Sequence, residues 1–161
     1  MSKNLVTICN STVHKTIIRD KKNYYNEKQS LQVLHLNYKD YLNVNYYPFP
    51  RLLEYNDKEL SLTLSYCGLS LNKISKLNIS NAEACINNIL YNVTYNNIID
   101  LDIKTDNICI LFEKIYLIDF DKVSFSTDKQ INYTADYYLF KYLIDKKIIR
   151  QGCLLLIPFL G

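Results

Sequence analysis

Asp-Leu-Asp-Ile-Lys-Thr-Asp-Asn, residues 100–107, is followed twelve residues after its last position by Asp-Phe-Asp, residues 119–121. They are connected by two apolar runs, residues 108–112 and 115–120, of which the second ends within Asp-Phe-Asp, and two charged residues separate the runs. Short apolar runs on either side of a polar pair are typical of two strands joined by a tight turn. The pattern therefore predicts a hairpin that brings the two polar segments together.

The side chains of these segments have the chemistry of a phosphoryl-transfer site. Asn107 and Asp119 offer the hard oxygen atoms that Mg²⁺ prefers. Asp102 can orient a hydroxyl group, and Lys104 can neutralise charge on a transferring phosphoryl group. Positioning and electrostatic stabilisation are the main requirements of that reaction. Because Asn and Asp are also common turn residues, the hypothesis depends on their joint spacing.

The two segments resemble motifs of the protein-kinase superfamily, whose catalytic loop reads H-R-D-[hydrophobic]-K-x-x-N and whose metal-binding motif is D-F-G. Residues 100–107 match the first as D-L-D-I-K-T-D-N, and residues 119–121 match the second as D-F-D. The similarity continues, in the right order, over roughly residues 5–149. It implies ATP as the phosphate donor, Mg²⁺ as the cofactor, and the roles given above for the polar residues.

The N-terminal part of the chain carries a lysine and a glutamate that fit the same family. Residues 13–15 read VHK and resemble the strand-borne A-x-K whose lysine holds the nucleotide α- and β-phosphates. Glu27 follows Lys15 by twelve residues and resembles the helix glutamate that pairs with this lysine. Taken alone, Lys15 could be a solvated strand residue and Glu27 an ordinary acid in the first turn of a helix.

A further resemblance concerns the nucleotide base. Residues 62–68, LTLSYCG, resemble the last strand of the family's N-terminal lobe and the hinge after it. The resemblance implies that the backbone of Ser65 and Cys67 meets adenine and that Cys109 lies beneath the base. Asp136 resembles the buried aspartate of a later helix, which anchors the catalytic loop.

We expect an α+β fold with the two lobes of a kinase in abbreviated form. The N-lobe is a small antiparallel β-sheet with one helix, and the C-lobe is mainly helical. The single kinase-like domain divides into an N-lobe of residues 1–65, a hinge of residues 66–70 and a truncated C-lobe of residues 71–161. Apolar periodicity predicts strands at residues 5–8, 12–18, 51–55, 60–67, 108–112 and 115–120, a turn at 20–23, and helices at 25–36, 81–97 (after Ser80 as N-cap) and 135–149.

Several family features are missing. No glycine precedes Gly68, so a multi-glycine phosphate loop is excluded. Asp121 replaces the glycine of D-F-G and places a third carboxylate near the metal. The short chain is closer to compact relatives, such as the lipopolysaccharide-core kinases, than to regulated protein kinases. An alternative function is a pseudokinase that acts as a nucleotide-binding or protein-interaction module without catalysis, and a third interpretation is a partial gene product without activity.

Composition limits the other classes of protein. The net charge of +3 includes no block of like charge, so we expect no nucleic-acid partner. The five cysteines contain no C-x-x-C pair, and there are two histidines, so we expect no zinc site. No apolar run is long enough for a membrane span, and we expect a cytoplasmic protein, in the host cytoplasm if the chain is viral. The sequence leaves open the oligomeric state and the hydroxyl acceptor, which could be a protein or a small molecule.

Overall fold

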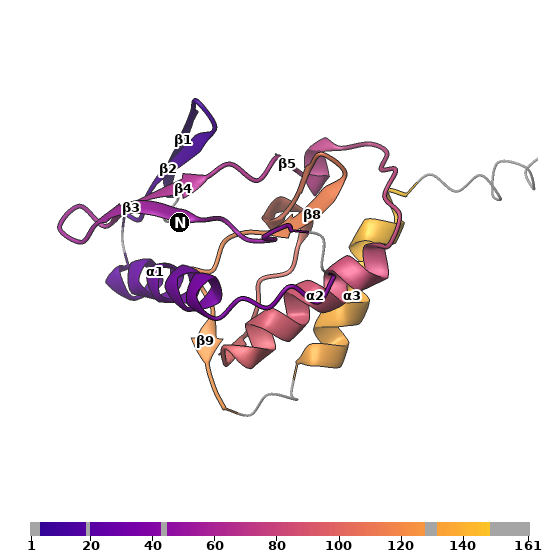
Figure 1. The fold of residues 1–161 in the computed structure, drawn as a ribbon. Coiled ribbons are helices and arrows are strands. Elements are labelled where there is room, and N and C mark those ends of the chain that lie inside the picture. Colours follow the sequence, from indigo (N-terminus) through magenta and orange to yellow (C-terminus); the bar gives the residue numbers. More distant parts are fainter. Residues whose placement is uncertain (1–3, 19, 43–44, 128–131, 149–161) are drawn as a thin grey trace, which may run out of the picture.

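A computed structural model describes residues 4–18, 20–42, 45–127 and 132–148 (Figure 1). In these residues the fold is α+β, with a four-stranded antiparallel sheet and three α-helices. The coarse fold class expected from the sequence is therefore confirmed. Ile149, the last residue of the expected third helix, and the rest of the chain after it lie outside the described residues.

The larger sheet is built from the first half of the chain. Its strand order is β1-β2-β4-β3, and all three pairings are antiparallel. Two leucines of β4, Leu62 and Leu64, are buried on the side that faces the rest of the protein. The strands are β1 Leu5–Cys9, β2 Thr12–Thr16, β3 Leu52–Asn56 and β4 Ser61–Ser65.

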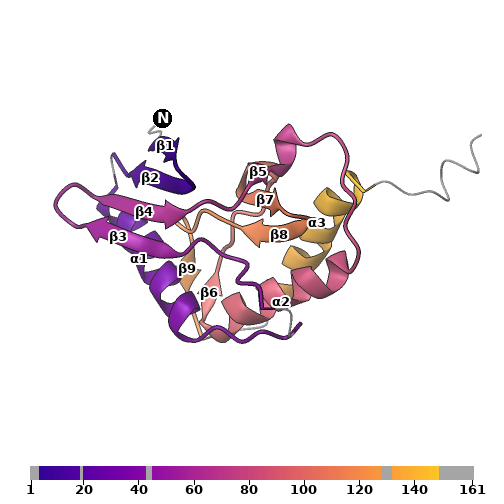
Figure 2. The same cartoon turned by 45° about the horizontal axis from the view of Figure 1, so that its top comes forward.

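Helix α1, Lys21–Leu36, lies along one face of this sheet (Figures 1 and 2). It begins four residues earlier than expected, because the Asp20 side chain accepts a hydrogen bond of 2.9 Å from the Lys22 amide and caps the helix. The expected turn at residues 20–23 is therefore wrong. The helix buries Leu31 and Leu34, which lie one turn apart on the same face.

The second half of the chain forms a group of two helices and several short strands. Helices α2 and α3 pack side by side, and β7 and β8 form a hairpin beside them (Figure 2). None of the helices in the described residues is long and apolar enough to cross a membrane. The elements are β5 Leu69–Ser70, the 3₁₀ turn η1 Leu71–Lys73, α2 Ala82–Tyr95, β6 Ile98–Ile99, η2 Thr105–Asn107, β7 Ile108–Leu111, β8 Lys114–Leu117, β9 Ser124–Phe125 and α3 Tyr133–Asp145.

Several expected boundaries in this half are wrong, and helix α2 ends at Tyr95 and helix α3 begins at Tyr133, each two residues earlier than expected. The N-cap of α2 is Asn81 and not Ser80, and Asn81 has a left-handed backbone with no side-chain cap. Strand β8 stops at Leu117, because the chain turns at Asp119, whose φ is +72°. The hairpin turn falls on Phe112 and Glu113, which both have positive φ. Apolar periodicity does not encode such backbone conformations, so it misplaces the ends of elements.

Gly68 connects the two halves of the structure. Its φ is +99°, and a Cβ atom at this position would lie 1.9 Å from the carbonyl oxygen of Ile110. The close approach is imposed by pairing, because the next residues, β5, are hydrogen-bonded to β7. Only glycine combines a left-handed backbone with so small a volume.

We expect Gly68→Ala to lower the free energy of unfolding by at least about 2 kcal/mol, since it adds backbone strain and a steric overlap. Urea unfolding followed by circular dichroism measures the change. Leu69→Ala is the control, because Leu69 is exposed and its truncation should cost well under about 1 kcal/mol. Equal losses in both variants would show that the tight approach to Ile110 is unimportant.

Candidate functional site

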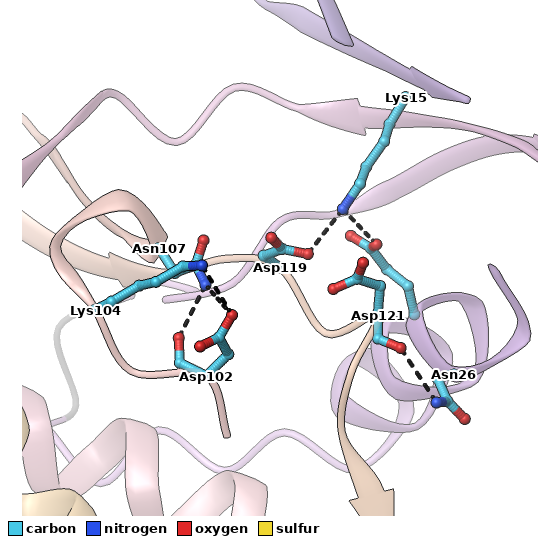
Figure 3. Close-up of polar contacts among 8 residues, drawn as sticks. Lys15, Asn26, Asp102, Lys104, Asn107, Asp119 and Asp121 are labelled. Atoms are coloured by element: carbon cyan, nitrogen blue, oxygen red, sulfur yellow. Dashed lines mark hydrogen bonds and ion pairs between the residues drawn. The ribbon is translucent and has the colours of Figure 1, made fainter. Parts of the chain in front are cut away.

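The centre of the site is the ammonium group of Lys15. Within β2, Lys15 is the one buried residue, whereas its neighbours are exposed or half-buried. Its Nζ atom lies 2.6 Å from Oε2 of Glu27 and 2.9 Å from Oδ1 of Asp119 (Figure 3). Burial works against the charged ammonium, but the two carboxylates outweigh this effect and raise the pKa of Lys15. The lysine is therefore a buried cation held between two acids.

Glu27 approaches from helix α1 and is only 1% exposed. Because α1 begins at Lys21, Glu27 lies in its second turn and not in the first turn that the sequence suggested. Burial raises the pKa of Glu27 to about 7, although the Lys15 ammonium acts in the opposite direction. The ion pair that the family resemblance implied for these two residues is present in the structure.

Asp119 and Asp121 follow strand β8. Burial alone would raise the pKa of Asp119, but the Lys15 ammonium and hydrogen bonds from Asp121 hold it below its ordinary value. Burial, together with the hydrogen bond to Asp119, raises the pKa of Asp121 to about 6. Below about pH 6 the pair therefore holds a proton, which Asp121 retains more readily than Asp119 does.

Asn26 is a supporting residue that the sequence analysis missed. Its side-chain amide donates hydrogen bonds to the carbonyl oxygens of Asp121 at 3.2 Å and Val123 at 3.1 Å. It thereby ties the chain after Asp119 to helix α1 (Figure 3). Its position beside Glu27 was the only available signal, because its partners lie more than ninety residues away in the sequence.

A second group of polar residues lies on the loop before β7. The Asn107 side chain is buried and donates to the backbone oxygen of Asp102 at 2.9 Å and to its Oδ2 atom at 3.3 Å. The Lys104 ammonium lies 3.2 Å from the same Oδ2 atom, and this contact raises the pKa of Lys104. The structure thus brings Asp102, Lys104 and Asn107 together, with the Asp102 carboxylate held by an amide and a cation.

The group around Asp102 lies where the β7–β8 hairpin begins, and the group around Asp119 lies where it ends. The two groups face each other (Figure 3). The Ile118 amide donates to the Asn107 carbonyl oxygen at 2.9 Å, so the expected hairpin does bring the two segments together. Asn107 and Asp119, the two expected metal ligands, lie on these adjoining segments. The acids that lie close to Asp119 are, however, Glu27 and Asp121. Oxygen atoms of these three carboxylates lie within 4.8 Å of one another.

The residues assigned to the nucleotide base lie around Gly68. Cys67 and Cys109 are both buried, and burial raises the pKa of each thiol, to about 12 and about 11. The nearby Cys109 also raises the pKa of the Cys67 thiol, since the chain beyond Gly68 pairs with β7. The Ser65 amide donates to the Arg51 carbonyl oxygen at 3.0 Å, so this amide belongs to the sheet.

Asp136 lies in the first turn of α3 and is half-buried. Burial, with a contribution from the negative charge of Asp100, raises the pKa of Asp136 to about 6. The carboxyl group is therefore near the start of the polar loop, as the resemblance implied, but the anchoring role stays a prediction.

Comparison with known proteins gives no family assignment. A scan against protein-family models finds no match, and a search of curated proteins finds none that is significant.

We expect Lys15→Met to lower the free energy of unfolding by about 3 kcal/mol at pH 8 in the presence of EDTA, because it leaves buried carboxylates without their cation. The loss should be smaller at pH 5. A carboxyl group whose folded pKa is raised, as for Glu27 at about 7, favours the folded state at low pH, and this contribution disappears as the pH rises through that value. Without Lys15 the pKa of Glu27 rises further. Urea unfolding at both pH values measures the effect.

Two further variants make this prediction specific. Lys15→Met combined with Glu27→Gln should recover most of the stability at pH 8. Lys28→Met removes a cation whose partner, Asp57, is nearly half exposed, and should cost less than about 1 kcal/mol. If Lys15→Met were no more harmful than Lys28→Met, or equally harmful at both pH values, the central role of the buried ammonium would be refuted.

Proposed function

We propose that this protein is a phosphotransferase of protein-kinase-like fold, which transfers the γ-phosphate of ATP to a hydroxyl group with the help of Mg²⁺. One observation carries the proposal. Lys15 contacts Glu27 and Asp119 simultaneously, and these residues come from three segments whose spacing matches the kinase lysine, helix glutamate and metal-binding aspartate. In this proposal residues 1–65 are the N-lobe, residues 66–70 the hinge and residues 71–161 the C-lobe.

The loop of residues 102–107 meets the segment of residues 119–121 at a place that we call the junction. The donor atoms at the junction are suited to Mg²⁺. Asp119 is an ionised carboxylate whose side chain is 28% exposed, and its low pKa favours metal binding. Asn107 would supply the second ligand, from the adjoining segment. Mg²⁺ at this position would stabilise the charge of the transferring phosphoryl group. Lys15, already held by Glu27, would bind the nucleotide phosphates.

Asp102 and Lys104 would act on the acceptor side. The Asp102 side chain is 32% exposed and the Lys104 side chain 48% exposed, so both can reach a substrate. Asp102 would accept a hydrogen bond from the acceptor hydroxyl and orient it toward the phosphate. Lys104 would offset negative charge on the oxygen atoms of the phosphoryl group. Asn107 fixes the position of Asp102 through its two hydrogen bonds.

A second function is favoured by the state of Asp119. Its carboxylate is bound to Lys15 and shares a hydrogen bond with Asp121, an acid where kinases have glycine. Together with the absence of glycine before Gly68, this supports a pseudokinase that binds nucleotide or a protein partner without transferring phosphate.

Thermal unfolding with ATP, with and without Mg²⁺, tests nucleotide binding. We expect stabilisation by ATP that increases with Mg²⁺, reaching about 2.7 kcal/mol at a ligand concentration one hundred times the Kd. Asp119→Asn should abolish the increase with Mg²⁺. If ATP stabilised the protein neither with nor without Mg²⁺, the result would contradict both the phosphotransferase and a nucleotide-binding pseudokinase.

The rate of ATP turnover distinguishes the phosphotransferase from a nucleotide-binding pseudokinase. Because the acceptor is unknown, ADP release in water is the measurement. We expect Asp102→Asn to reduce it by at least about 100-fold while ATP still stabilises the protein, since general-base and orienting groups contribute on this scale. Asp106→Asn is the control, because Asp106 is an exposed carboxylate of the same loop. Nucleotide binding with equal background turnover in wild type and Asp102→Asn would favour the pseudokinase.

A further inference from the structure

Three buried asparagines lie along one side of helix α2. They are Asn88, Asn92 and Asn96, spaced four residues apart, and they are 1%, 0% and 9% exposed. The first two belong to the helix and the third is its C-cap, so all three share one face. Asparagine is a poor helix former, and its buried amide needs hydrogen bonds. This row, which we call the asparagine ladder, therefore requires a reason outside the helix.

The asparagine ladder binds the segment that follows helix α1. Asn92 makes two hydrogen bonds with the backbone of Lys39. Its Oδ1 atom accepts from the Lys39 amide at 2.8 Å, and its Nδ2 atom donates to the Lys39 carbonyl oxygen at 2.9 Å. One turn away, the Asn88 Oδ1 atom accepts from the Tyr41 amide at 3.1 Å. The ladder thus recognises backbone groups of a segment from the other half of the chain.

The partners of the asparagine ladder are spaced two residues apart. The Asn96 Oδ1 atom accepts a hydrogen bond of 2.9 Å from the Asn37 side chain, so residues 37, 39 and 41 meet successive asparagines. Two residues of extended chain span about 6.6 Å and four residues of helix about 6 Å, so the two spacings match. Residues 38–40 belong to no helix or strand, and the chain after α1 runs along α2 (Figures 1 and 2). The ladder therefore supplies hydrogen bonds that regular structure would otherwise provide.

Side chains on the outside of the segment continue the contact with α2. The Lys39 ammonium lies over the Tyr95 ring at 4.6 Å from its centroid. The Tyr41 ring meets the Tyr91 ring edge to face at 5.2 Å. Buried hydrogen bonds and outer ring contacts therefore both join this segment to the same helix.

Helix α1 carries Glu27, and its other polar attachments are near its N-terminus. The Asp57 carboxylate accepts hydrogen bonds from the Tyr24 hydroxyl at 2.7 Å and the Lys28 ammonium at 2.9 Å, and Asn26 bonds the chain after β8. The apolar packing of the helix is non-directional, so a helix held only at this end could pivot. The asparagine ladder holds the opposite end to the second half of the structure.

We propose that the asparagine ladder positions helix α1 so that Glu27 holds Lys15 beside Asp119 before any ligand binds. The ladder acts through α1 and touches none of these three side chains, so its members are positioning residues. The attachment of α1 stands on the contacts described above, whereas its effect on nucleotide binding rests on the proposed function. The two statements are therefore tested by separate measurements.

Amide hydrogen exchange of the full chain without ligand, resolved by residue with NMR, tests the attachment. We expect the amides of Lys39 and Tyr41 to exchange slowly in the wild type, although they lie outside helices and strands. Asn92→Ala should speed exchange at least about tenfold at these amides and in helix α1 around Glu27. Asn88→Ala breaks only the contact with residue 41 among the backbone bonds of the ladder, and should give a smaller change in the same places if Asn92→Ala does not fold.

Asn87→Ala is the matched control for lost stability. Asn87 is a half-buried residue of the same helix, and it accepts a hydrogen bond of 2.6 Å from the Tyr133 hydroxyl, within the second half of the structure. Its substitution should speed exchange in α3 and leave α1 unchanged. Faster exchange confined to residues 37–41 in the ladder variants, equal effects on α1 in the control, or fast exchange of the Lys39 and Tyr41 amides in the wild type would overturn the proposal.

Calorimetric titration with ATP and Mg²⁺, at a temperature at which all variants are folded, measures the consequence for the site. We expect Asn92→Ala to bind about fivefold more weakly than the wild type and Asn87→Ala to bind as the wild type does. If the wild type and both variants bind equally, the positioning role is refuted and the proposed function stands. If the wild type does not bind ATP but exchange in α1 responds as expected, the attachment of α1 stands and the proposed function fails.

Discussion

The relative positions of the sheet, helix α1 and the chain after β8 depend on the ion pairs of the buried Lys15 ammonium. A cation in a site of low dielectric is costly unless opposite charges meet it at hydrogen-bond distance. Glu27 and Asp119 meet it at 2.6 Å and 2.9 Å. Glu27 belongs to helix α1 and Asp119 to the chain after β8. Because the charge of Lys15 must be neutralised, the sheet is held to helix α1 and to the chain after β8. Any displacement of these elements would leave a charge uncompensated.

The short segment from Asp119 to Asp121 is held by contacts to strand β2, to Phe49 before strand β3 and to helix α1. Asp119 pairs with the sheet lysine, whereas Phe120 is fully buried and meets the Phe49 ring edge to face at 5.9 Å. The Asp121 carbonyl oxygen accepts the hydrogen bond from Asn26. These anchors explain how Asp119 retains a positive φ of +72°, a conformation that is tolerated only where its surroundings enforce it. The same anchors hold its carboxylate toward the junction, where the proposed reaction would take place.

Different parts of the structure were predictable to different degrees. Apolar periodicity located the three helices and the β7–β8 hairpin, because burial of one face imposes that pattern on the sequence. It misplaced the beginning of α1, which depends on the Asp20 cap, and the end of β8, which depends on the backbone of Asp119. The spacing of residues 100–107 and 119–121 predicted that the polar groups meet. It contained no information on Asn26, whose partners are chosen by packing.

The order of amino acids along the chain specifies the chemistry available at the junction: a strand lysine, a helix acid, and a loop and hairpin with carboxylates and amides at characteristic spacings. How the charges are shared depends on contacts between elements that are distant in the sequence. These contacts pair Lys15 with Asp119 across 104 positions and make Asp121 retain its proton more readily than Asp119. Local spacing fixes which residues can be neighbours along one element, whereas burial and pairing between distant elements decide which charges and hydrogen bonds are satisfied.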